Sequence, residues 1–133
     1  MREFRANGGN VGGVFAGRSL LLLHTLGAQT GEPRVNPVEY LAVDAGYAVF
    51  ATNDGSEQNP GWYHNLLAHP MVKVEVGSST IEVKAREAAG SERTEIWERQ
   101  KALRPAFAEY ETQTAREIPV IVLETLPELT ASA

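Results

Sequence analysis

The chain has 133 residues, of which 43% are hydrophobic and 22% are charged, and its formal net charge at pH 7 is −5. This length and composition predict a single globular domain over residues 1–133 with a core of its own. The negative charge argues against non-specific nucleic-acid binding, which needs a basic surface, and the absence of cysteine excludes disulfides, thiolate metal sites and cysteine nucleophiles.

The first segment, residues 1–17, is rich in glycine. It contains Gly8, Gly9, Gly12, Gly13 and Gly17. Glycine at this density does not support a helix, so we expect a loop that lies close to other backbone. A phosphate-binding loop is not indicated, because no Gly-Lys-Ser or Gly-Lys-Thr follows and the next segment is predicted to be a strand.

Three strands are predicted in the first half of the chain. The continuous apolar run Leu20–Leu23 indicates a strand that is covered on both faces. A turn over residues 27–33 precedes a second strand from Val35 to Val43. The sequence Asp44-Ala45-Gly46 then signals a tight hairpin into a third strand from Tyr47 to Thr52.

The second half alternates helices and strands. Pro60 suits the first turn of a helix that stops before Pro70. Alternating apolar residues then predict two strands, 72–76 and 81–85, which a turn at 77–79 joins.

A longer helical region is predicted from Ser91. Its apolar side contains Ile96, Trp97 and Leu103, and the pattern resumes behind Pro105. This amphipathic pattern indicates a helix that packs on the sheet with one side.

A final strand from Ile118 to Leu123 completes about six strands, joined mostly by hairpins and accompanied by two helical insertions; the tail 127–133 is expected to be frayed. Hairpins imply antiparallel pairing, and a sheet of this size commonly closes to remove its edges. The predicted fold is mainly β, a small barrel with a helix between its third and fourth strands. No apolar run is long enough to span a bilayer, so we expect a cytoplasmic protein, with attachment to a membrane surface left open.

Metal and hydrolytic chemistry are poorly supported. The histidines, His24, His64 and His69, lack the spacing of a zinc-binding helix. No Gly-x-Ser-x-Gly motif is present, and the serines have no obvious base nearby in sequence. We therefore expect neither a metal site nor nucleophilic hydrolysis.

Two segments suit the binding of a bulky organic cofactor. Arg34 is a natural ligand for a phosphate or carboxylate. The pattern is equally compatible with an ordinary surface residue of a strand. Asn36-Pro37 places a proline in mid-strand, where its missing N–H indicates an edge, a bulge or a rim beside a ligand. Trp62 and Tyr63 follow Pro60-Gly61 at a helix start, where free N–H groups can bind anionic oxygens. The alternative for the two aromatic side chains is simple packing in the core.

These segments resemble the signature of the deazaflavin-dependent nitroreductase family, which uses coenzyme F420. The stretches that carry the resemblance are Asn7-Gly8-Gly9, Leu20–Leu23, Gly31-Glu32-Pro33-Arg34-Val35-Asn36-Pro37, Pro60-Gly61-Trp62-Tyr63-His64-Asn65-Leu66 and Arg116-Glu117-Ile118-Pro119-Val120-Ile121-Val122-Leu123. They occur in the family's order and cover most of the chain. No single motif carries the resemblance.

The resemblance implies a split β-barrel like the FMN-binding split barrels of flavin oxidoreductases, with F420 in a groove. Reduced F420 would give a hydride to an electron-poor acceptor such as a nitroaromatic, a quinone or an activated alkene. The protein would contribute positioning and electrostatics, because the hydride chemistry belongs to the cofactor.

The resemblance also implies a set of site residues. Those expected to hold the cofactor are Gln29, Thr30, Arg34 and Asn36 near its phosphate and acidic tail, Ala51, Thr52 and Asn53 beside the deazaflavin, and Pro60, Gly61 and Trp62 over the same ring region. Pro37 is a further candidate for binding the cofactor. Those expected to border the acceptor pocket are Glu39, Phe107 and Tyr110, with Glu39 and Tyr110 as the catalytic candidates.

Departures from the family pattern leave alternatives open. Ala28-Gln29 and Asn53 stand where the family usually has basic residues, so Arg34 is the main cation left for a polyanionic tail. One alternative is therefore a split barrel that binds FMN or another flavin, since a single phosphate needs less positive charge. Glu39, Arg104 and Phe107 stand at family tyrosine positions. The changes at Glu39 and Phe107 suggest the other alternative, a non-catalytic member that binds a cofactor or a hydrophobic ligand. We expect a monomer or a homodimer.

Overall fold

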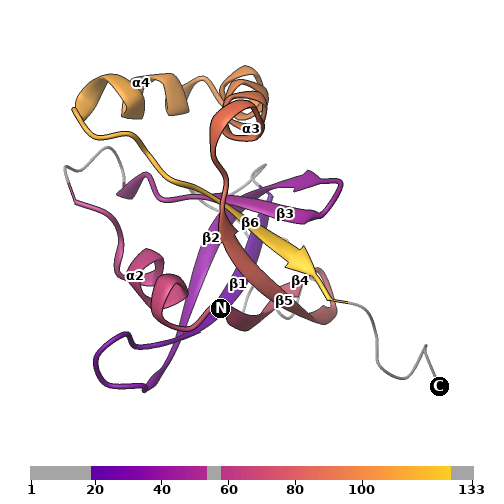
Figure 1. Ribbon diagram of the computed structural model, residues 1–133. Coiled ribbons are helices and arrows are strands. Elements are labelled where there is room, and N and C mark those ends of the chain that lie inside the picture. The colour runs from indigo at the N-terminus through magenta and orange to yellow at the C-terminus, as the bar shows by residue number, and fades with distance from the viewer. Residues whose placement is uncertain (1–18, 54–57, 127–133) are drawn as a thin grey trace.

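Six antiparallel strands form a closed barrel in the computed structural model, which describes residues 19–53 and 58–126 (Figure 1). The strands are β1 (Leu20–Leu26), β2 (Pro33–Val43), β3 (Gly46–Phe50), β4 (Met71–Val76), β5 (Ser79–Glu87) and β6 (Val120–Thr125). Their order around the barrel is β1-β2-β3-β6-β5-β4. The predicted mainly β fold is confirmed, whereas the predicted glycine-rich loop at 1–17 and the frayed tail at 127–133 lie outside the described residues.

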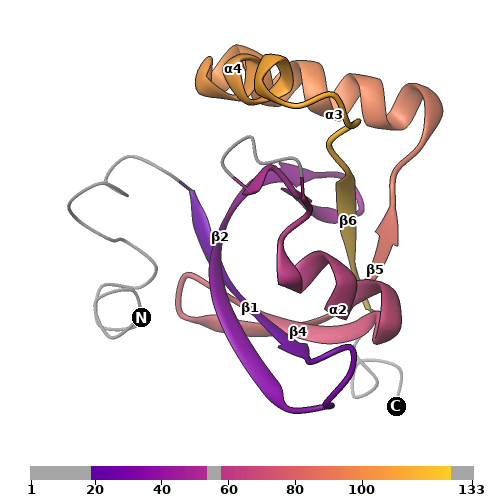
Figure 2. The ribbon, with the colours of Figure 1, turned by 90° about the vertical axis from the view of Figure 1, so that its left-hand side faces the viewer.

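Three helices accompany the barrel in the described residues. Helix α2 (Gly61–Ala68) connects β3 to β4 as predicted and lies across one end of the barrel (Figure 2). Helices α3 (Gly90–Leu103) and α4 (Ala106–Gln113) form a separate layer over β3 and β6.

The two predicted helical insertions are present, one between β3 and β4 and one between β5 and β6, and Pro105 divides the second into α3 and α4. Proline has no N–H and restricts the residue before it to extended backbone, and Arg104 accordingly has φ −132° and ψ 88°. The chain therefore turns between α3 and α4. Leu103, predicted on the buried side, ends α3 at this turn and is 66% exposed.

The hydrophobic core of the described residues has two large parts, because side chains alternate between the two faces of each strand, and a small third cluster of Leu20 and Leu22 with Val35 against it. The residues buried inside the barrel are Leu21, Leu23, Val38, Val49, Leu66, Val74, Val83, Ala85, Ile121 and Leu123. Those buried between the sheet and the helix layer are Leu41, Ala48, Phe50, Ala88, Ile96, Trp97, Phe107, Ile118, Val120 and Val122. The second part fixes α4 beside the end of β3, which matters for the site.

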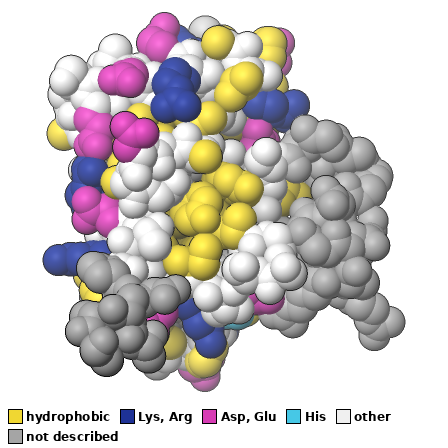
Figure 3. Space-filling view, turned by 90° about the vertical axis from the view of Figure 1, so that its right-hand side faces the viewer, with side chains coloured by type: hydrophobic (Ala, Val, Ile, Leu, Met, Phe, Trp, Pro, Cys, Tyr) yellow, Lys and Arg dark blue, Asp and Glu magenta, His cyan; other side chains and the backbone are white. Residues whose placement is uncertain are grey.

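The surface carries charges of both signs. On the face shown in Figure 3, basic and acidic side chains lie around the helices, and hydrophobic side chains gather near the centre. None of the helices in residues 19–53 and 58–126 combines the length and apolar character needed to cross a bilayer.

Strands β2 and β3 separate along their length. Residues Tyr40–Val43 of β2 pair with Gly46–Val49 of β3, but residues 33–39 of β2 pair only with β1 among the described strands. Pro37 lies on this open part. Because the Tyr40 N–H donates to Ser19 O toward β1 and N–H direction alternates along a strand, the nitrogen of Pro37 faces the open edge. The predicted edge position of Pro37 is confirmed.

We predict that Gly46→Ala destabilises the fold by about 2 kcal/mol or more. Gly46 has φ 150°, and a Cβ there would collide with the carbonyl oxygen of Leu123 on the neighbouring strand. Gly61→Ala is the matched control, since a Cβ at Gly61 meets nothing within 4 Å and alanine is the better helix former. Urea unfolding of both variants measures the difference; equal stabilities would contradict the prediction.

Candidate functional site

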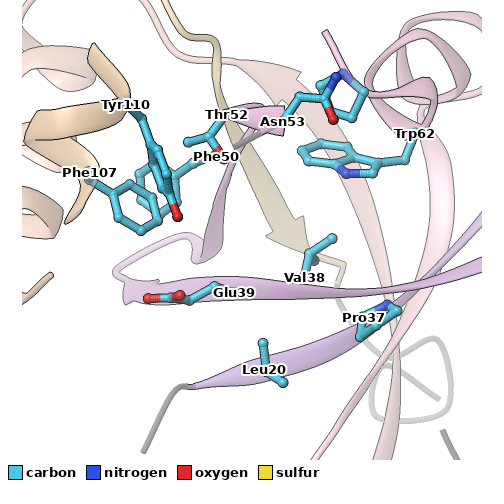
Figure 4. A pocket seen from close by; sticks show the side chains of 11 residues that line it. Leu20, Pro37, Val38, Glu39, Phe50, Thr52, Asn53, Trp62, Phe107 and Tyr110 are labelled. Atoms are coloured by element: carbon cyan, nitrogen blue, oxygen red, sulfur yellow. The ribbon is translucent and has the colours of Figure 1, made fainter. Parts of the chain in front are cut away.

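A cavity of about 240 Å³ lies where β2 and β3 separate (Figure 4). Strand β2 forms one wall, the end of β3 and the start of α2 form the opposite wall, and α4 closes one end. The residues that line it are Leu20, Pro37, Val38, Glu39, Phe50, Thr52, Asn53, Pro60, Trp62, Phe107 and Tyr110. Most of these walls are apolar or aromatic, and Glu39 is the one charged side chain among them.

The two ends of the cavity differ chemically. At one end the Trp62 indole lies beside Asn53 and faces Val38 and Pro37 across the opening. At the other end the rings of Phe107 and Tyr110 lie above Glu39.

Phe107 is held in place by its neighbours. Its ring packs against Phe50 at 5.4 Å between centroids, against Trp97 at 5.9 Å and against Tyr110 at 5.4 Å. This aromatic cluster ties α4 to β3 and α3 and gives Tyr110 a fixed neighbour.

The Glu39 carboxylate is fixed by α3. Its Oε2 accepts hydrogen bonds from Arg104 Nε at 2.9 Å and from Gln100 Nε2 at 3.1 Å. Gln100 is only 2% exposed, and the side chains of Glu39 and Arg104 are 15% and 30% exposed. The ion pair is therefore shielded from water, and Glu39 presents a carboxylate that can only accept hydrogen bonds.

The segment between β3 and α2 is held from behind by Arg116. Its Nη2 donates to the carbonyl oxygens of Ala51 at 3.0 Å, Thr52 at 3.0 Å and Gln58 at 3.3 Å, and its Nη1 donates to Asn59 Oδ1 at 2.6 Å. Burial lowers the pKa of Arg116. The guanidinium nevertheless stays charged at neutral pH, because an arginine pKa begins above 12.

Tyr63, on α2 beside the cavity wall, stays protonated under ordinary conditions. Burial, together with the hydrogen bond of 2.7 Å from its hydroxyl to Glu87 Oε1, raises the pKa of Tyr63 to about 12. Tyr63 does not line the cavity. Its partner Glu87 ties the start of α2 to β5.

The structure brings eight of the predicted site residues together around one cavity. They are Pro37, Glu39, Thr52, Asn53, Pro60, Trp62, Phe107 and Tyr110. The residues predicted near the deazaflavin and those predicted for the acceptor pocket therefore share one space. Their roles in binding and catalysis stay predictions.

The other predicted residues lie outside this cavity. Ala51 is fully buried behind the wall, Gly61 is exposed at the start of α2, and Asn36 is exposed opposite Leu23 on β1. Gln29 and Thr30 are exposed in the turn before β2.

Arg34 lies near that turn and away from the cavity. Its side chain is 52% exposed and lies 3.5 Å from Glu32 Oε2. It borders a separate groove, which His24, Lys73 and Met71 also line.

Sequence reasoning named the two arginines that fix the site but missed the groups that they bind. Arg104 and Arg116 both act on residues more than fifty positions away in the sequence, so no local pattern announces them. The motif from Arg116 to Leu123 contained one of them, but nothing in that motif indicates what its guanidinium contacts.

Comparison with known proteins identifies the family. A family model described as F420H(2)-dependent quinone reductase matches residues 1–125. An F420H(2)-dependent quinone reductase of Mycobacterium tuberculosis is 34% identical in an alignment of 126 residues that covers 90% of this chain and 83% of the relative. The chain belongs to the F420H(2)-dependent quinone reductase family. The prediction of an F420-dependent oxidoreductase family is thus confirmed.

Solved structures agree with this family and with the predicted split barrel. A structure of an F420-H2 dependent reductase has a TM-score of 0.73 and 36% identity, over 80% of this chain and 95% of the other. A structure described as a domain-swapped dimer has a TM-score of 0.74 and 36% identity, over 80% and 81% of the two chains. The heme storage protein HutZ from Vibrio cholerae, at 16% identity with a TM-score of 0.65 over 84% of each chain, shares the fold alone.

The cavity suits the flat redox ring of the family's cofactor. Aromatic and aliphatic side chains form its walls, and the open edge of β2 and the end of β3 supply backbone polar groups beside them. A flat heteroaromatic ring needs this combination of apolar faces and polar edges. The residues present therefore fit F420.

We predict that Arg104→Met lowers the free energy of unfolding by about 1–3 kcal/mol, because it leaves the shielded Glu39 carboxylate without its cation. The control is Arg34→Met, which removes a pair whose side chains are 52% and 67% exposed and should cost under about 0.5 kcal/mol. Urea unfolding of both variants is the measurement. A loss at Arg104 no larger than the loss at Arg34 would contradict a fixing role for the ion pair.

Proposed function

We propose that this protein transfers a hydride from reduced F420 to a quinone, and that nitroaromatics and activated alkenes can replace the quinone as acceptors. The observation that carries this proposal is the cavity at the separation of β2 and β3, where eight predicted site residues meet. Its aromatic walls, its backbone edges and membership of the quinone reductase family point to the same chemistry.

The cofactor is proposed to lie at the end of the cavity that Trp62 forms. There the indole and Pro37 offer apolar faces to a ring, while Thr52 and Asn53 offer backbone groups to its edge. Bound F420 supplies the hydride, and the protein supplies position and a shielded environment.

The phosphorylated tail of F420 is proposed to leave the cavity toward the turn before β2. Arg34, Asn36, Gln29 and Thr30 are exposed in this region. Arg34 and Lys73 are the cations that line the groove here, and His24, which also lines it, lies 2.6 Å from Glu75 Oε2 through its Nε2. Exposed contacts of this kind bind a polyanion with modest strength and strong dependence on salt.

The acceptor is proposed to lie at the other end, between the ring of Phe107 and the carboxylate of Glu39. Reduction of a quinone to a hydroquinone needs one hydride and one proton. The Tyr110 hydroxyl is placed to donate that proton and to recover one from solvent. Glu39, positioned by the hydrogen bond from Arg104, can accept a hydrogen bond from the hydroxyl that forms.

A titration of the protein with F420, followed by fluorescence, tests the proposal together with turnover of a menaquinone analogue. We expect saturable binding of F420 and oxidation of reduced F420 only when the quinone is present. A protein purified with bound flavin and without affinity for F420 would instead support the FMN alternative. Binding of F420 without turnover of any acceptor would support the non-catalytic alternative. The monomer-or-homodimer state and the cytoplasmic location stay predictions, and sedimentation would test the former.

We predict that Trp62→Ala weakens F420 binding about tenfold or more, because the ring loses its largest aromatic contact. The control is Leu67→Ala on the same helix, since Leu67 is 57% exposed and does not line the cavity. Fluorescence titration gives both dissociation constants. Equal affinities of the two variants would place the ring elsewhere.

We predict that Tyr110→Phe lowers kcat for the quinone about 10- to 100-fold, because a positioned proton donor is lost. The affinity for F420 should not change. Tyr47→Phe serves as the control, since Tyr47 packs edge-on against Tyr40 and does not line the cavity. Steady-state kinetics with saturating reduced F420 is the measurement, and an unchanged kcat would assign the proton to solvent.

A further inference from the structure

Arg116 binds two consecutive carbonyl groups of the cavity wall, those of Ala51 and Thr52. In a trans peptide unit the C=O and the N–H point in opposite directions, and the described residues contain no cis peptide bond. The N–H groups of Thr52 and Asn53 belong to the same two peptide units as these carbonyls. Both N–H groups therefore point away from the guanidinium.

The side away from Arg116 is the side of the cavity. Strand β3 lies between β6 and β2, and the Ala51 N–H donates to Pro119 O just before β6 at 3.0 Å. The opposite edge faces β2, where the two strands have separated and the cavity begins. Thr52 and Asn53 line that cavity, whereas Arg116 borders a different groove behind the wall.

The backbone at Asn53 supports the same arrangement. Asn53 has φ 46°, the one positive φ of a non-glycine residue in the described part of the chain. Successive N–H groups that converge next to a left-handed residue form a concave cradle for an anionic or carbonyl oxygen. For the N–H of Thr52 or Asn53, we find no hydrogen-bond partner among the described residues. Such strain persists where the surroundings enforce it. Here Arg116 binds the carbonyl groups of Ala51 and Thr52, and Asn53 Nδ2 donates to Gln58 O at 3.0 Å.

We propose that Arg116 is a positioning residue of the cofactor site, which turns the N–H groups of Thr52 and Asn53 toward the cavity without touching the cofactor. This inference rests on the proposed function, because the acceptor for these N–H donors is the polar edge of the F420 ring. The same guanidinium binds Gln58 and Asn59 ahead of Pro60, so it also sets the start of α2 relative to the end of β3.

The test compares Arg116→Ala and Arg116→Lys with Arg86→Ala. Arg86 is the matched control because it makes hydrogen bonds of 2.6 to 2.8 Å to Glu92 and Glu124, away from the cavity. Fluorescence titration gives the dissociation constant for F420, thermal unfolding gives stability, and steady-state kinetics separates KM from kcat.

For Arg116→Ala we expect the dissociation constant and the KM for reduced F420 to rise about tenfold, as for two weakened hydrogen bonds, with kcat changed much less. Arg116→Lys should recover part of the affinity, because an ammonium can still bind one or two of the carbonyls. Arg86→Ala should lower the thermal stability while leaving the dissociation constant within about twofold.

Three results would overturn the inference. The first is an unchanged dissociation constant for F420 in Arg116→Ala. The second is a loss of affinity in Arg86→Ala as large as that in Arg116→Ala when the two variants lose the same stability. The third result applies if Arg116→Ala does not fold. Wild-type affinity for F420 in both Arg116→Lys and Asn59→Ala would then overturn the inference. Failure of the wild-type protein to bind F420 would overturn the proposed function itself, so the two failures are distinguishable.

Discussion

The separation of β2 from β3 is the constraint on which the site depends. A closed barrel normally satisfies every backbone group between neighbouring strands, and it leaves no room for a ligand between them. Here pairing stops beyond Tyr40 and Val49, so among the described strands this part of β2 keeps β1 as its one partner, and β3 turns toward α2. The cavity, its aromatic ends and its backbone donors all follow from this local loss of pairing.

Electrostatic contacts fix the walls of this opening from outside the cavity. Arg104 and Gln100 hold Glu39 from α3, and Arg116 holds the end of β3 from the segment before β6. Both guanidinium groups are partly shielded from solvent, so their hydrogen bonds are stronger than those of an exposed ion pair. The cavity itself keeps apolar faces and one carboxylate, which suits a flat ring and a polar acceptor.

Much of this fold was predictable from the sequence, because its signals are local. The run Leu20–Leu23, the hairpin at Gly46 and the alternation around Val74 and Val83 each report on neighbouring residues, and Pro37 marked the open edge. The break at Pro105 was visible as a proline but was read as an interruption within one helix.

The site was predictable in its residue types and less so in its geometry. Trp62, Thr52 and Tyr110 belong to recognisable segments, so the resemblance placed them correctly around one space. Arg34 was expected near the phosphate and acidic tail of the cofactor, and that role stays a prediction. It lies on the exposed outer part of β2, because a strand extends about 3.3 Å per residue and carries it away from Pro37. The partners of Arg104 and Arg116 depend on tertiary contacts, which one sequence does not reveal.

An unpaired strand edge is a liability as well as an opportunity, since it offers a template on which another polypeptide can add a strand. At the centre of the open stretch of β2 stands Pro37, which contributes no donor on that side. A foreign strand could therefore not complete a continuous ladder there. The proline ring that borders the cavity thus limits how far another strand could extend the sheet at this edge.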